Sequence, residues 1–111
     1  MMVIAGAGKF AGPSRGAVIW VEQLRVPDLS AGTYCIPAGG IDEQAPHTED
    51  EIYVVTAGRA TLVSGGEEAA VGRGSVIYVP AGEMHRFTDI AEDLALLVVF
   101  GPAEYSRAAE G

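Results

Sequence analysis

Two histidines and a glutamate are the residues of this chain whose types and spacing could hold a metal ion. His47 and Glu51 lie four residues apart at the start of a β-forming run, and His85 follows a second such run. Alternate residues of a strand share a face, so His47, Glu49 and Glu51 can point to one side. Two imidazoles and one carboxylate with open positions suit Fe(II) and also accept Mn, Ni or Zn. The predicted ligands of a divalent metal are therefore His47, Glu51 and His85.

Both histidines lie within motifs that glycines punctuate. The first motif contains Gly39, His47, Glu51 and Gly58. The second motif contains Gly74, Pro80, Gly82 and His85. In their order and spacing these residues resemble the two motifs of the cupin superfamily, and the resemblance covers about residues 17–102.

Two positions depart from the cupin motifs. Ala45 stands where the family has its first histidine, and Asp89 replaces the closing asparagine. The resemblance implies a site of three histidines and one glutamate, so Gln44, Glu49 or Asp42 could supply a further ligand. The sequence does not choose among them. Gln44 adjoins Ala45 and carries a carbonyl oxygen, so it joins the predicted metal ligands.

The resemblance implies a metal-dependent enzyme that acts on a small organic molecule. Dioxygenase-like oxidation, isomerisation, elimination by a lyase and cyclisation all occur in the superfamily, and Glu49 or Tyr53 is the predicted catalytic acid or base. The alternatives are a non-catalytic cupin that binds or senses a ligand, which Ala45 favours, and a structural barrel with a decayed metal site. Five aromatic residues could line the cavity: Trp20, Tyr53, Tyr78, Phe87 and Phe100.

Short β-forming runs recur between glycines and prolines, which predicts an all-β fold of antiparallel strands in a sandwich or barrel. The cupin resemblance makes this a double-sheet jelly-roll barrel. The predicted strands cover residues 17–26, 32–36, 51–56, 59–64, 75–79 and 94–100. A short helical tail is expected over residues 103–110, after Pro102.

Turn residues connect these runs. Gly65-Gly66 predicts a primed two-residue turn into the run 67–71. Pro80-Ala81-Gly82 predicts a tight turn, with a positive φ at the glycine, that delivers His85 to the mouth of the barrel.

A chain of 111 residues suffices for one domain, which we divide into an arm or edge strand (1–16), a barrel (17–102) and a tail (103–111). The net charge of −8 argues against nucleic acid and anionic membranes as partners. Cys35 is expected to be a small buried residue. The lone cysteine and the lack of a recognisable export signal predict a cytoplasmic location. The resemblance implies a homodimer, which a monomeric mass by light scattering would contradict.

Overall fold

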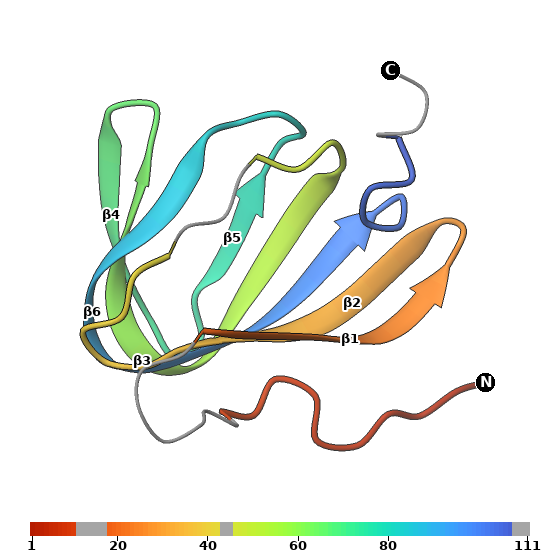
Figure 1. Cartoon of the computed structure of the whole chain (residues 1–111), viewed down its shortest axis with the longest axis horizontal. Helices are drawn as coiled ribbons and strands as arrows, with labels where there is room; N and C mark the ends of the chain where they lie inside the picture. Colours follow the sequence, from red (N-terminus) through yellow and green to blue (C-terminus); the bar gives the residue numbers. More distant parts are fainter. Residues whose placement is uncertain (11–17, 43–45, 108–111) are drawn as a thin grey trace.

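The computed structural model describes residues 1–10, 18–42 and 46–107, and all six strands lie within them. The strands are β1 (Ile19–Val26), β2 (Leu29–Ile36), β3 (Asp50–Ser64), β4 (Glu67–Gly72), β5 (Val76–Val79) and β6 (His85–Gly101). They pair antiparallel in the order β1-β2-β6-β3-β4, with β5 on β3. Figure 1 shows this sheet curving round an interior, with the β1–β2 hairpin on one side and the β3–β4 hairpin on the other. The predicted all-β barrel is confirmed.

The two longest strands, β3 and β6, run side by side through the middle of the sheet. The runs predicted at 51–56 and 59–64 are one strand, because the pairing of β3 with β6 only shifts register between Val55 and Thr61. Strand β6 begins at His85, nine residues before the predicted start. The segment 86–93 was not predicted as a strand because it carries several exposed charged residues and lacks a continuous apolar run. These long central strands span the whole barrel.

The core lies between the inward faces of the central strands. Its largest fully buried apolar side chains are Tyr53, Phe87, Phe100, Ile36, Leu94 and Leu96. The rings of Tyr53 and Phe87 pack edge to face at 5.1 Å. Each such side chain contributes roughly 1.5–3 kcal/mol on burial. The core therefore gives the strands that carry the candidate ligands a rigid support.

The predicted turns are confirmed. Gly65 and Gly66 have φ values of 57° and 84°, as a primed turn requires. Gly82 has a φ of 79°, and the Glu83 amide donates to the Pro80 carbonyl at 3.2 Å. Asp89 has a φ of 49°, a conformation that asparagine and aspartate tolerate better than most residues, so the aspartate at this motif position suits its backbone.

The predicted C-terminal helix is wrong over its described part, because residues 103–107 form turns. Tyr105 has a φ of 62°, in the left-handed region, which a right-handed helix does not contain. Backbone amides of this segment donate to barrel side chains: Glu104 N–H to Ser30 Oγ, and Arg107 N–H to Glu49. In a helix that began at residue 103, the Arg107 N–H would bond to the carbonyl of that residue, so here a tertiary hydrogen bond takes the place of a helical one.

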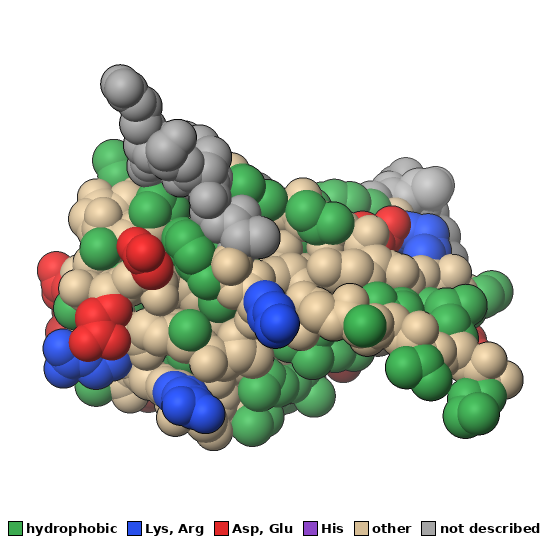
Figure 2. All heavy atoms as spheres, turned by 90° about the horizontal axis from the view of Figure 1, so that it is seen from below, with side chains coloured by type: hydrophobic (Ala, Val, Ile, Leu, Met, Phe, Trp, Pro, Cys, Tyr) green, Lys and Arg blue, Asp and Glu red, His purple; other side chains and the backbone are tan. Residues whose placement is uncertain are grey.

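The N-terminal segment lies along the outside of the barrel. Its Gly8 amide donates to Thr33 Oγ1 at 2.8 Å, and the Thr56 hydroxyl donates to the Gly8 carbonyl. Figure 2 shows that hydrophobic side chains reach the surface on this side, where neither histidine is visible. Cys35 is buried as expected. The homodimer and the domain boundaries stay predictions. Among the described residues there is no helix long and apolar enough to cross a bilayer.

Candidate metal centre

The two motifs meet at one end of the barrel. His47 precedes β3, Glu51 is the second residue of that strand, and His85 opens β6. The Gly82 amide, in the turn between β5 and β6, donates to the His47 carbonyl at 2.8 Å. The positive φ of Gly82 thus places a backbone donor of the second motif against the backbone of the first.

The donor atoms of the three predicted ligands converge. Glu51 Oε1 lies 3.2 Å from His85 Nε2 and 3.7 Å from His47 Nδ1. One donor atom from each residue lies within 4.8 Å of the others, and all three side chains are buried. Ligand bonds of about 2.0–2.2 Å place two atoms that share an ion roughly 3–4 Å apart. The cluster has the spacing of a chelating set.

Three atoms of this cluster lack hydrogen bonds. Among the described residues, no hydrogen-bond partner reaches Glu51 Oε1, Glu51 Oε2 or His47 Nδ1. The 3.2 Å contact of Glu51 with His85 is an ion-pair distance without hydrogen-bond geometry. A buried carboxylate without donors is costly, and a bound cation removes that cost.

Hydrogen bonds fix the orientation of His85. Its Nδ1 lies 2.9 Å from the Glu83 carbonyl, which can only accept, so Nδ1–H donates. The neutral ring then turns the lone pair of Nε2 toward Glu51 and the Tyr53 hydroxyl, which lies 2.9 Å away. Burial lowers the pKa of His85, but the Glu51 carboxylate and the Glu83 carbonyl outweigh burial and raise it. The position of Nε2 therefore attracts a cation, either a proton or a metal ion.

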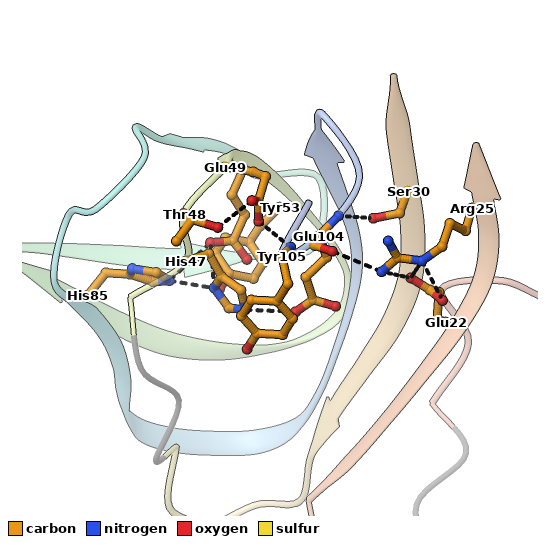
Figure 3. A network of polar contacts seen from close by, with 11 residues as sticks. Glu22, Arg25, Ser30, His47, Thr48, Glu49, Tyr53, His85, Glu104 and Tyr105 are labelled. Atoms are coloured by element: carbon orange, nitrogen blue, oxygen red, sulfur yellow. Dashed lines mark hydrogen bonds and ion pairs between the residues drawn. The ribbon is translucent and has the colours of Figure 1, made fainter. Parts of the chain in front are cut away.

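His47 is oriented by a carboxylate outside both motifs. Its Nε2 lies 2.9 Å from Glu104 Oε2, so Nε2–H donates and Nδ1 faces Glu51. Tyr105 stacks on the imidazole, with ring centroids 5.4 Å apart. Figure 3 shows Glu104 on one side of His47 and His85 on the other. Carboxylate–histidine pairs of this kind commonly orient metal ligands.

A cavity of about 160 Å³ opens beside the cluster. It is lined by Trp20, Tyr34, His47, Glu51, Tyr53, Val98, Phe100, Glu104 and Tyr105. Three of the aromatic residues predicted to line it, Trp20, Tyr53 and Phe100, do so. Phe87 lies in the core and Tyr78 is exposed.

Comparison with known proteins agrees with this architecture. The sequence profile of the Cupin domain matches residues 32–100, which include both motifs. The chain belongs to the cupin family. Its sequence is 49% identical to an uncharacterized protein of Streptomyces coelicolor over 85 residues, covering 77% of this chain and 81% of that protein.

Solved structures share the fold of this cupin. A Cupin 2 conserved barrel domain protein from Salinispora arenicola superposes with a TM-score of 0.71 and 22% identity, covering 91% of this chain and 89% of that one. KdgF from Halomonas sp. superposes with a TM-score of 0.69 and 22% identity, covering 77% and 78%. At this identity the likeness establishes the barrel alone.

Two of the residues considered as replacements for the missing histidine, Asp42 and Glu49, are engaged by other groups in this cupin. Both oxygens of Asp42 are engaged, one by the Tyr34 hydroxyl at 2.6 Å and the other by the Phe87 amide at 2.9 Å. Gln44 and Ala45 lie outside the described residues, so the assignment of Gln44 as a ligand stays a prediction.

Glu49 faces the C-terminal segment. Its carboxylate accepts from the backbone amides of Tyr105 and Arg107 and from the Thr48 hydroxyl. Strand β3 begins at Asp50, so strand alternation does not extend back to Glu49. Burial raises the pKa of this carboxyl, but the three hydrogen bonds outweigh burial and lower it. The predicted acid–base role of Glu49 stays untested, as does that of Tyr53.

We expect Glu49→Gln to loosen residues 103–107. Hydrogen bonds to a charged acceptor contribute about 1.5–3 kcal/mol, so hydrogen exchange at the Tyr105 and Arg107 amides should become roughly ten to a hundred times faster. Because the pKa of Glu49 is lowered in the folded chain, its carboxylate stabilises the fold fully at pH values above the ordinary carboxyl pKa. That stabilisation is lost as the pH falls through the lowered value, so acid should mimic the variant. Unchanged exchange in Glu49→Gln would contradict this role.

Proposed function

We propose that this cupin binds one divalent metal ion through His47, Glu51 and His85 and acts on a small organic molecule held beside it. The observation that supports the proposal is the unsatisfied buried cluster: both oxygens of Glu51 and Nδ1 of His47 have no hydrogen-bond partner among the described residues. Three protein ligands leave coordination positions open, as catalytic metal sites require.

The chain's own residues would divide the work at this site. When bound, the metal supplies Lewis acidity that polarises a carbonyl or hydroxyl oxygen. Glu104 orients the His47 ring, and the Glu83 carbonyl orients His85. The Tyr53 hydroxyl, buried 2.9 Å from His85 Nε2, is a proton donor or acceptor within hydrogen-bond distance of the cluster. Phe100 and Val98 line the cavity and limit the entry of water.

A non-catalytic cupin that binds or senses a ligand is the second candidate. The engagement of Glu49 favours it, because three hydrogen bonds hold that carboxylate to the C-terminal segment. Without Glu49, Tyr53 is left as the predicted acid or base. The two candidates differ in product formation, which mass spectrometry of metal-loaded protein incubated with diketones, phenols and sugars would detect.

Metal content tests the proposal directly. Untagged protein, reloaded separately with Fe(II), Mn(II), Ni(II) and Zn(II) and then desalted, should retain close to one equivalent of at least one metal by elemental mass spectrometry. The identity of that metal narrows the class of reaction. Failure to retain any of the four after reloading would contradict the proposed function.

A further inference from the structure

The cavity beside the metal centre carries negative charge without a positive counterpart in its wall. Glu51 and Glu104 line it, and none of the described lining residues is lysine or arginine. Arg25, a cation in the same polar network, pairs with Glu22 at 2.8 Å and donates to the Glu104 backbone carbonyl at 3.0 Å. Its guanidinium is therefore already engaged outside the cavity (Figure 3).

Aromatic rings form most of the remaining wall. Trp20 packs edge to face with Tyr34 at 6.5 Å and with Phe100 at 6.1 Å. A Cβ on Gly32 would lie 2.4 Å from the indole, so the glycine makes room for the ring. Trp20 is 37% exposed and Tyr105 is 55% exposed, which leaves aromatic surface open to a ligand. Aromatic faces attract cations.

The two carboxylates lie on opposite sides of the His47 ring. Glu51 faces Nδ1 in the metal cluster, whereas Glu104 binds Nε2. A metal ion held by Glu51 would thus leave the carboxylate of Glu104 on the far side of the imidazole, toward Tyr105. The volume of about 160 Å³ is close to that of an engineered cavity that holds benzene, so the ligand is compact.

We infer that this cavity selects a small organic cation, an ammonium group on a compact apolar body, held by Glu104 and the aromatic wall. The inference rests on the proposed function in placing this ligand beside the metal centre. Cation–aromatic attraction and the carboxylate both favour such a ligand over a neutral molecule of the same shape. In the metal-free cavity, the lining carboxylates Glu51 and Glu104 disfavour its anionic counterpart.

Three probes of the same branched shape test the role of charge: choline, 3,3-dimethylbutan-1-ol and 3,3-dimethylbutanoate. Each is titrated at constant ionic strength into metal-free protein, followed by fluorescence of Trp20, the chain's single tryptophan, and by calorimetry. We expect choline to bind about ten times more tightly than the alcohol, and the anion to bind most weakly. Equal affinities, preference for the anion, or no binding of any probe by calorimetry would overturn the inference.

A pair of variants locates the selectivity. Glu104→Gln should remove most of the preference for choline over the alcohol, while Glu92→Gln, which alters an exposed carboxylate paired with Arg59, should retain it. Retained preference in Glu104→Gln would overturn the role of that carboxylate. Because the probes are measured without metal, loss of metal binding alone refutes the proposed function, and loss of charge selectivity alone refutes this inference.

Discussion

His85→Ala is expected to lower the affinity for divalent metal by roughly a thousandfold or more. Removing an outer partner of a metal ligand already costs about 10–100-fold, and this change removes a ligand atom itself. Only His47 and Glu51 of the converging set remain in the variant. Elemental mass spectrometry after reloading, together with competition against a chelator, measures the loss. Equal metal content in variant and wild type would contradict the ligand assignment.

Glu83→Gln is the matched control for this experiment. The side chain of Glu83 is exposed and accepts from the Ser64 hydroxyl, whereas its backbone carbonyl holds His85 Nδ1. The substitution changes the charge two residues from His85 but preserves the carbonyl, so metal binding should persist. Metal should also raise the unfolding temperature of wild type and Glu83→Gln, but not that of His85→Ala, because a ligand stabilises only a chain that binds it.

The convergence of His47, Glu51 and His85 could be predicted from the sequence because all three residues lie within the two motifs. The motifs place Glu51 near the start of β3 and His85 at the start of β6, which are opposite ends of the antiparallel β3–β6 ladder. The curvature of the sheet round the interior brings these two ends together (Figure 1). Glu104 could not be predicted, since it lies beyond both motifs in a segment taken for a helix. Its contact with His47 depends on tertiary hydrogen bonds that hold residues 103–107 against the barrel.

Local patterns also did not show which groups Glu49 contacts. Strand alternation places His47, Glu49 and Glu51 on one face, and all three are buried. Burial alone did not show what each faces, because the regular strand begins only at Asp50. The Glu49 carboxylate therefore binds the C-terminal segment, while the Glu51 carboxylate faces His47 and His85. To predict which groups Glu49 and Glu51 face, one must know where the strand begins, and strand boundaries are the least certain feature of a sequence-based prediction.

Gly58→Ala is expected to lower the free energy of unfolding by about 3–5 kcal/mol, because Gly58 lies where the backbones of β3 and β6 approach closely. The residue has a φ of 88°, in the left-handed region, at the register shift between β3 and β6. An added Cβ would lie 2.2 Å from the Asp93 carbonyl oxygen and 2.8 Å from its carbon. Backbone atoms cannot rotate aside, so the two longest strands would have to separate.

Gly66→Ala separates the two causes of this loss. Gly66 has a φ of 84°, close to that of Gly58, but an added Cβ there meets nothing within 4 Å. Backbone strain alone should therefore destabilise the Gly66→Ala variant, by about 1–2 kcal/mol. Urea denaturation monitored by circular dichroism compares the two, and equal destabilisation would refute the steric explanation. A larger loss at Gly58 would mean that the closing glycine of the first motif is required by the close approach of β3 to β6, the two strands that bring Glu51 and His85 together.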